Sequence, residues 1–202
     1  MIQLPHSKHI DKVFWLLFIL LGAVSLISLF SASSTLVYKQ DSVFEPIGRH
    51  FFFLIIGFIA AYFIQFMQSR WIRYGGYVVL IIADIFVYSL LIPNNPFAVT
   101  RNEATRWMNL FGFEFQPSEL AKVALVIVIA DQLARINSEE DKKKIFFRTL
   151  IITGLTVLPI MTSNMSTAIL MCMVVFFLWI LARLPWKYIL STAGAAIAAA
   201  TC

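Results

Sequence analysis

The sequence predicts an all-α fold, a polytopic bundle of membrane-spanning helices. Of the 202 residues, 60% are apolar and 13% are charged, whereas soluble proteins have roughly 45–50% apolar and about 25% charged residues. The apolar residues gather into seven runs, and most of these approach the roughly 17–25 residues with which a helix crosses a bilayer. We therefore expect a single transmembrane domain over residues 1–202.

Short polar or basic connections separate the expected spans. The first run is longer than the apolar region of a secretory signal, about 7–15 residues, so we expect it to be retained although Ser31–Ser33 resembles a cleavage site. The last run is cut off at Cys202, which leads us to expect that the chain is part of a longer one. The expected spans are residues 13–30, 51–67, 74–92, 117–133, 146–161, 167–182 and 188–200.

Two prolines mark expected helix ends. Pro117 suits the first turn of the fourth span, because the N–H that proline lacks has no partner there. Pro159 predicts that the fifth span ends or kinks just before it. The residues from Met161 to Ser166 leave room only for a tight turn into the sixth span.

The basic residues alternate between the two sides of the expected bundle. Eleven lysines and arginines fall in the connections on the side of the N-terminus, and four fall on the opposite side. Cytoplasmic loops carry the excess of basic residues, so we expect the N-terminus in the cytoplasm and residues 93–116 outside. The net charge of +5 is thus a topology signal, and it does not indicate nucleic-acid binding.

The outer loop ends in aromatic residues that alternate with other types. Trp107 is followed by Phe111, Phe113 and Phe115, and a period of two predicts an extended segment with one apolar face. This face is either an aromatic belt at the membrane surface or a platform beside an entrance for lipid.

Charged residues open the fourth span, where hydrocarbon would be expected. Glu119 in the first helical turn suits the positive helix end, with Gln116 at the cap. Lys122 lies three residues further, on the same helix face. The pair is either a cap with a lysine reaching for the surface or the lining of a cavity open to the outer leaflet, since charge inside a membrane is costly and often functional.

Further polar residues lie within or beside spans. Asp84 in the third span needs a partner or a proton. It either pairs with Lys122 on the neighbouring span or is a neutral or hydrogen-bonded structural residue. Asp131 and Arg135 have the i, i+4 spacing of an ordinary interfacial ion pair. Asn164, in the turn between spans five and six, is either part of a helix cap or a hydrogen-bonding group of the outer cavity.

The sequence contains no metal-ligand cluster, no glycine-rich phosphate loop and no Ser/His/Asp arrangement. An anionic substrate would therefore be held by basic side chains, for which Arg106 and Lys122 are the best candidates. Cys172 and Cys202 have no evident disulfide partner and indicate small apolar fillers.

Residues 104–107 and 113–122 together resemble a known motif. Ala-Thr-Arg-Trp followed by Phe-Glu-Phe-Gln-Pro-Ser-Glu-Leu-Ala-Lys is similar to the signature of the SEDS family of shape, elongation, division and sporulation proteins, FtsW, RodA and SpoVE, and most like an FtsW-type division member. The resemblance implies that this chain is the N-terminal half of a fold of about ten spans. It also matches Arg106, Glu119 and Lys122 to functionally important positions around a central cavity.

The resemblance implies a peptidoglycan glycosyltransferase that polymerises lipid II into glycan strands during bacterial cell division. The expected partners are lipid II, a class B penicillin-binding protein, other division proteins and membrane lipid, at the inner membrane. No cofactor is expected, although a divalent cation is compatible with the family. The alternatives are a lipid II flippase or transporter, and a division scaffold without chemistry.

Three departures from the family pattern bear on activity. Asn164 stands where the family motif Gln-Pro-Asp-x-Gly-Thr has its carboxylate, and Glu103 stands where a glycine is frequent. The resemblance also places the family's proposed catalytic aspartate in a later outer loop, beyond Cys202. We therefore expect residues 1–202 to be inactive alone.

Overall fold

The computed structural model describes residues 12–34, 44–93, 95–101, 104–110 and 112–192. Helices dominate the described chain, and the contacts between residues divide it into two compact units, Met1–Met67 and Gln68–Cys202. The membrane-helix fold class is thereby confirmed, whereas the single domain over residues 1–202 stays a prediction. Four described helices are long and apolar enough to cross a membrane, and they cover Lys12–Ala32, Ile47–Phe66, Ser69–Ser89 and Glu139–Ser163.

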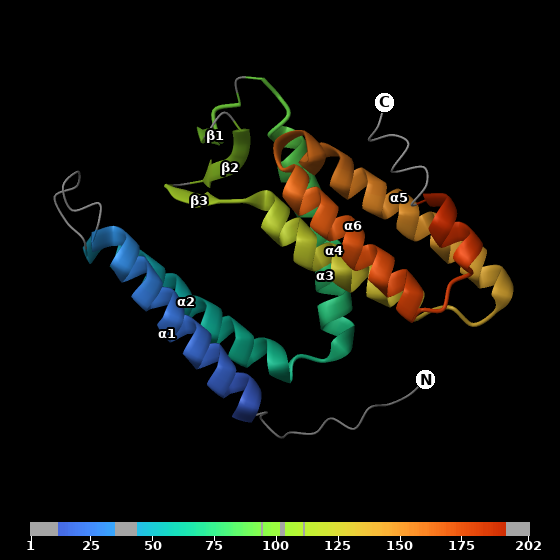
Figure 1. The fold of residues 1–202 in the computed structure, drawn as a ribbon, viewed down its shortest axis with the longest axis horizontal. Coiled ribbons are helices and arrows are strands. Elements are labelled where there is room, and N and C mark those ends of the chain that lie inside the picture. Colours follow the sequence, from blue (N-terminus) through green and yellow to red (C-terminus); the bar gives the residue numbers. More distant parts are fainter. Residues whose placement is uncertain (1–11, 35–43, 94, 102–103, 111, 193–202) are drawn as a thin grey trace. The chain divides into compact units, whose positions relative to one another are not determined.

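The first unit is a pair of apolar helices that lie side by side (Figure 1). Helix α1 covers Lys12–Ser34 and helix α2 covers Phe44–Phe66. Trp15 near the start of α1 donates through Nε1 to Gln65 Oε1 near the end of α2, at 3.3 Å. None of the residues in either candidate span is buried, and helices that expose apolar side chains all round are typical of a membrane environment.

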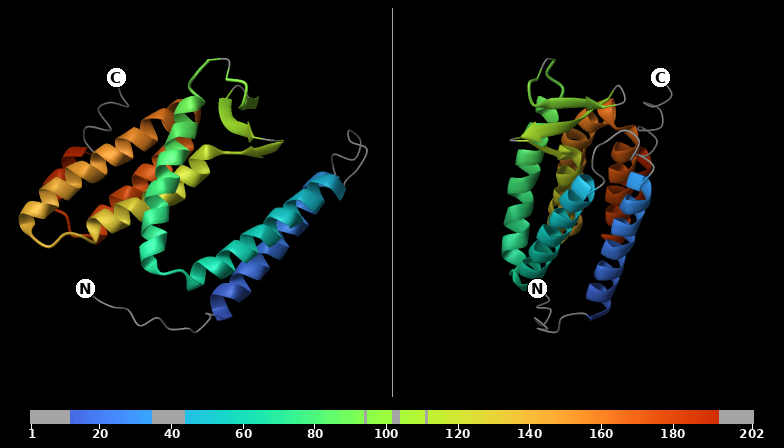
Figure 2. Two further views of the ribbon diagram at one scale, coloured as in Figure 1. Left: turned by 180° about the vertical axis from the view of Figure 1, so that it is seen from behind. Right: turned by 90° about the vertical axis from the view of Figure 1, so that its left-hand side faces the viewer.

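The second unit is built around a central helix, α4. It contains α3 (Ser69–Ser89), α4 (Pro117–Leu133), α5 (Glu139–Ser163) and α6 (Met165–Leu181), and α4 contacts each of the other three. Figure 2 shows α3 and the α5–α6 pair on different sides of α4. The small side chains of Ala121 and Ala124, both buried, suit such a crowded position because they let helix backbones approach closely.

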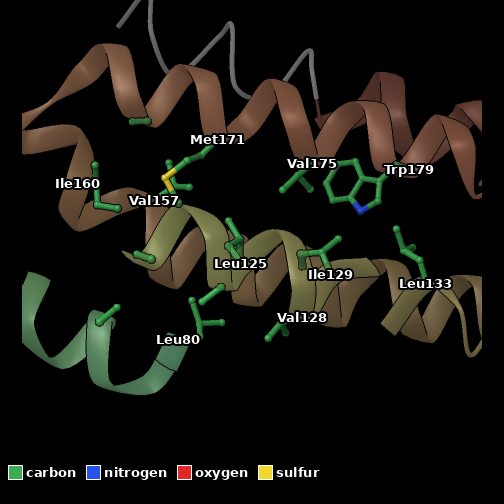
Figure 3. Close-up of a cluster of buried hydrophobic side chains, with 14 of the residues drawn as sticks. Leu80, Leu125, Val128, Ile129, Leu133, Val157, Ile160, Met171, Val175 and Trp179 are labelled. Carbon is green, nitrogen blue, oxygen red and sulfur yellow. The ribbon is translucent and has the colours of Figure 1, made fainter. Parts of the chain in front are cut away.

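The core of this unit lies along α4. Figure 3 shows Leu125 and Ile129 of α4 near Val175 and Trp179 of α6, while Val128 is on the side of α3. Trp179 is buried and donates through Nε1 to the buried Thr149 hydroxyl at 3.0 Å. The indole N–H of Trp179 thus has a hydrogen-bond partner inside the core, as buried indole N–H groups usually do.

A small antiparallel sheet connects α3 to α4. Its strands are β1 (Ala98–Arg101), β2 (Ala104–Leu110) and β3 (Phe113–Phe115), in the order β1-β2-β3. The register pairs Met108 with Phe115, and the Phe115 ring lies edge-on to Phe86 of α3, with 5.8 Å between ring centroids. The extended segment predicted from the aromatic alternation is therefore part of a sheet, which the all-α prediction did not include; Phe111 lies outside the described residues.

Several helix ends differ from the predictions, and α2, α3 and α5 begin at Phe44, Ser69 and Glu139, against predicted starts at residues 51, 74 and 146. α5 begins at Glu139, seven residues before the predicted start, because Ser138 and Asp141 form a reciprocal capping box that satisfies two otherwise unpaired backbone N–H groups. α5 also continues through Pro159 to Ser163, so of the two outcomes predicted at the proline the helix end is wrong and the kink stays a prediction.

The remaining segments agree with tight connections. Asn164 alone separates α5 from α6, as the short turn predicted. The seventh predicted span, 188–200, begins inside a helical stretch at 186–192, and its remaining residues lie outside the described part of the chain.

Candidate functional site

The sheet end of the second unit brings together most of the predicted site residues. Gln116 precedes α4 with an extended backbone and is the N-cap residue, as predicted, but its side chain does not cap the helix. Instead its amide donates to the buried Ser118 hydroxyl at 2.8 Å. The open helix end leaves the positive end of the helix dipole available to a carboxylate or another anion.

Glu119 and Lys122 form the predicted i, i+3 pair in the first turn of α4. Lys122 Nζ lies 3.0 Å from Glu119 Oε1 and 2.9 Å from Oε2. The Glu119 side chain is 55% exposed and that of Lys122 27% exposed. The pair is thus partly shielded on the lysine side, and the prediction that it lines an outer cavity stays a prediction.

Arg106 connects the sheet to the end of α5. It is exposed on β2, and its Nε donates to the backbone oxygen of Ser163 at 2.5 Å. Its two terminal amino groups make no hydrogen bond to the described residues. A guanidinium that is fixed at Nε and has these amino groups available can bind an anion in two-point fashion.

Asn164 follows Ser163 and caps the next helix. Its Oδ1 accepts a hydrogen bond from the backbone N–H of Thr167 at 3.2 Å, which is the capping role proposed for it. Within the described chain, no hydrogen bond or ion pair joins Arg106 or Asn164 to the Glu119–Lys122 pair. The structure therefore gives two polar groups at this end: one on β2 and the α5–α6 turn, the other on α4.

Asp84 has a different partner from the one proposed. Its Oδ2 accepts a hydrogen bond from the Thr156 hydroxyl of α5 at 3.1 Å, whereas Lys122 is paired with Glu119. The pairing of Asp84 with Lys122 is therefore wrong in this structure, because α5 approaches α3 at this level. The other oxygen, Oδ1, is buried and has no hydrogen-bond partner among the described residues, and Asp84 lines a cavity of about 540 Å³ on α3.

Asp131, a buried carboxylate at the opposite end of α4, has more partners than its spacing in the sequence predicted. The Asp131 side chain is only 2% exposed. It accepts from Arg135 Nη2 at 2.7 Å, from the Tyr77 hydroxyl at 3.0 Å and from Arg73 Nη1 at 3.4 Å. The hydrogen bond to Asp131, together with the charge of that carboxylate, raises the pKa of the Arg135 guanidinium. The predicted i, i+4 pair of Asp131 with Arg135 is therefore present, and Asp131 is in addition the centre of a network between α3 and α4 that the spacing did not predict.

The network continues to α5 through Gln132. The buried Gln132 amide donates to the Tyr77 hydroxyl at 2.6 Å, and its Oε1 accepts from Arg148 Nη1 at 3.3 Å. The sequence signal was present in the polar pair Asp131-Gln132 inside an apolar helix. The partners could not be predicted, because Arg73 and Tyr77 lie more than fifty residues away.

The divalent cation and the departure at Glu103 are two points of the sequence analysis that the described residues do not test. Among the residues that the structure describes, no group of three or more His, Cys, Asp or Glu side chains could hold a metal ion, so a divalent cation stays a prediction. Glu103, which departs from the family pattern, lies outside the described ranges.

A comparison with protein families shows to which family the chain belongs. The FTSW_RODA_SPOVE family model, described as "Cell cycle protein", matches residues 10–202. The chain belongs to this family. The match includes both parts of the motif noted in the sequence, Arg106–Trp107 and Gln116–Lys122.

Curated relatives support this family assignment. "Probable peptidoglycan glycosyltransferase FtsW" of Enterococcus hirae is 30% identical over 93% of this chain and 48% of its own length. "Stage V sporulation protein E" of Bacillus subtilis is 30% identical over 68% of this chain and 36% of its own length. The chain thus spans about half the length of the longest-matching curated relatives.

Solved structures support the fold. The rod shape determining protein RodA of Thermus thermophilus aligns with a TM-score of 0.71 and 22% identity, over 95% of this chain and 60% of that chain. A chain from a peptidoglycan synthase complex aligns with a TM-score of 0.62 and 22% identity, over 86% of this chain and 51% of that chain. At this identity the likeness concerns the helical fold alone.

Proposed function

We propose that the protein containing this chain is a peptidoglycan glycosyltransferase that polymerises lipid II during bacterial cell division. Family membership and the glycosyltransferase name of the Enterococcus hirae relative support the reaction class. The observation that carries the proposal for this half is the Glu119–Lys122 pair at the start of α4, near the sheet that carries Arg106. These residues supply positive charge where an anionic lipid-linked substrate must be held.

The residues of this chain act on the pyrophosphate of the substrate. In the reaction, a sugar hydroxyl of one lipid-linked molecule gives its proton to a general base and bonds to the sugar of another, and the lipid pyrophosphate leaves. Arg106 and Lys122 offset the charge that develops on this leaving group. The general base is the aspartate that the family resemblance places beyond residue 202.

Glu119 holds Lys122 in position before the substrate arrives. The carboxylate lies 2.9 Å from the ammonium group, and charged side chains at membrane depth are usually paired with one another in this way. A pyrophosphate oxygen can bind another of the three Lys122 N–H groups without breaking the pair. Asn164, which stands in place of the family carboxylate, stabilises the α5–α6 turn to which Arg106 is bound.

The proposal includes a location and partners. The excess of basic residues on one side supports a bacterial inner-membrane protein with its N-terminus in the cytoplasm and the sheet end of the second unit on the outer side. A class B penicillin-binding protein is the proposed partner that crosslinks the new glycan, with other division proteins in the assembly.

Replacing Lys122 tests the role of the pair. In the full-length protein, Lys122→Ala should reduce the polymerisation of purified lipid II at least about tenfold, because removing a transition-state charge contact costs more than about 1.4 kcal/mol. Lys142→Ala is the matched control, since Lys142 forms the same i, i+3 pair with Glu139 at the other end of the bundle. Wild-type polymerisation by the Lys122 variant would refute the proposed role.

Transport of lipid II is the second candidate, and one observation favours it. Asp84 and Thr156 place a polar group in the middle of α3 and α5, between the sheet end and the Asp131 network. Polymerisation and translocation can be measured on the same proteoliposomes. Lipid II that crosses the membrane without forming glycan strands would favour the transporter over the polymerase.

A further inference from the structure

A groove on α5 combines basic and apolar side chains in separate halves. It encloses about 640 Å³ and is lined by Lys143, Lys144, Phe147, Arg148, Ile151 and Ile152. The basic residues lie over the first turns of the helix, and the apolar residues extend further along it. From residue 143 to residue 152 the helix rises roughly 14 Å. We refer to this surface as the α5 groove.

The two lysines of the α5 groove are available to a ligand. Lys143 and Lys144 are exposed, and no carboxylate of the described residues lies within 4 Å of either ammonium group. Lys142 differs, because it is paired with Glu139 at 2.6 Å. The neighbouring Asp141 carboxylate accepts from the backbone N–H of Ser138 in the capping box. Asp141 interacts with Lys144 only electrostatically, without a close ion pair, so neither lysine of the groove is neutralised by direct contact.

Arg148 is held at the edge of the α5 groove by a buried partner. Its Nη1 donates to Oε1 of Gln132, and Gln132 is fixed in turn by its hydrogen bond to the Tyr77 hydroxyl. The other N–H groups of Arg148 have no hydrogen-bond partner among the described residues. A positioned guanidinium loses less conformational freedom on binding an anion than a mobile one does.

The apolar half of the α5 groove selects for a lipid. Phe147 is 46% exposed and Ile151 is 60% exposed, and both lie in a helix that is apolar and long enough to cross a membrane. A soluble anion would leave these side chains uncovered. A molecule with a phosphate group at one end and an acyl chain at the other matches both halves.

We propose that the α5 groove binds one anionic phospholipid of the leaflet on the side of the N-terminus. The lipid phosphate lies among Lys143, Lys144 and Arg148, and one acyl chain follows Phe147 and Ile151. This assignment is independent of the polymerase activity, because none of these residues belongs to the Arg106 and Glu119–Lys122 site. Gln132 is a positioning residue for Arg148.

The test compares two double variants that each lose two positive charges. The full-length protein is purified in detergent and titrated with phosphatidylglycerol or phosphatidylcholine of identical chains, and bound lipid is counted by native mass spectrometry. Lys143→Gln with Lys144→Gln should weaken phosphatidylglycerol binding about 25-fold, at about fivefold per charge, and leave phosphatidylcholine binding unchanged. The control, Arg70→Gln with Lys142→Gln, removes charges outside the groove and should change binding less than about twofold.

Three outcomes would overturn the proposal. Equal losses in the two double variants would show attraction by overall charge without a site. If the wild-type protein showed no preference for phosphatidylglycerol, the basic side chains of the groove would bind another partner, such as an acidic protein segment. Displacement of the lipid by an equal concentration of inorganic phosphate would show an anion site that does not use the apolar half. Circular dichroism of each variant verifies that the helices are intact.

Discussion

At the scale of single residues, two groups of charged side chains lie at opposite ends of α4. Glu119 and Lys122 form a partly exposed pair at the start of α4, and Asp131 is a buried carboxylate near its end. The first pair was predictable from spacing, because both of its members lie on one helical turn. The environment of Asp131 was not, because it depends on Arg73 and Tyr77 from another helix.

Asp131→Asn should destabilise the protein by about 1–3 kcal/mol, because it weakens charge-assisted hydrogen bonds at a buried position. The loss stays below the largest values for buried ion pairs, since the Arg73 and Arg135 side chains are 47% and 60% exposed and water can solvate them. Thermal unfolding in detergent measures the effect. Glu139→Gln is the control; it alters an 81% exposed carboxylate and should change stability by less than about 0.5 kcal/mol. Equal stability of the two variants would contradict the importance of the network.

At the scale of elements, the α3–α4 contact depends on a glycine. A Cβ atom at Gly76 would lie 2.6 Å from Ile127 Cγ2 and 3.1 Å from Ile127 Cβ, whereas a Cβ at the adjacent Gly75 would meet nothing within 4 Å. Isoleucine is stiff near its backbone, so α4 cannot easily give way. Close approach at Gly76 also brings Asp131 of α4 within reach of Tyr77, the residue after Gly76.

Gly76→Ala should therefore destabilise the protein by about 1–3 kcal/mol through overpacking. Gly75→Ala should be neutral or stabilise it by up to about 1 kcal/mol, because alanine is the better helix former. Thermal unfolding of the two variants under one condition measures the difference. If Gly76→Ala were as stable as Gly75→Ala, the helices would not be in the close contact described here.

The elements also show where sequence reasoning was sufficient. Apolar runs predicted the positions of α1 to α6, because a spanning helix must satisfy its backbone hydrogen bonds internally and cover itself with apolar side chains. The extension of α5 back to Glu139 depended on a cap outside the apolar run. Pro159 did not end α5, since membrane helices tolerate proline where neighbouring helices and side chains satisfy the backbone groups that it leaves without a partner. The sheet was only partly visible, because its first strand, β1, has no strong alternation of apolar residues.

At the scale of the whole molecule, the chain contains only part of the proposed machinery. It spans about half the length of its curated relatives. In the proposed mechanism, Arg106 and the Glu119–Lys122 pair offset the charge of the leaving pyrophosphate, and neither group supplies the general base. The family motif predicts this division of roles, which stays a prediction. The separation into two compact units could not be predicted from the sequence, because apolar periodicity does not say which helices contact each other.

The central claim is that the Glu119–Lys122 pair faces water on the outer side of the membrane. The direct test replaces Lys122 by cysteine in a full-length protein whose own cysteines, Cys172 among them, are changed to alanine. Intact spheroplasts are then treated with a maleimide that cannot cross membranes. Leu120→Cys is the control, since Leu120 is an apolar side chain, 45% exposed, in the same helical turn.

We expect rapid labelling of the Lys122→Cys protein from outside and slow labelling of the Leu120→Cys protein, because maleimides react with thiolates that water can reach. Failure of the Lys122→Cys protein to react, while it inserts normally and labels after solubilisation and unfolding, would contradict the claim that this pair lies in a water-filled, substrate-accessible space.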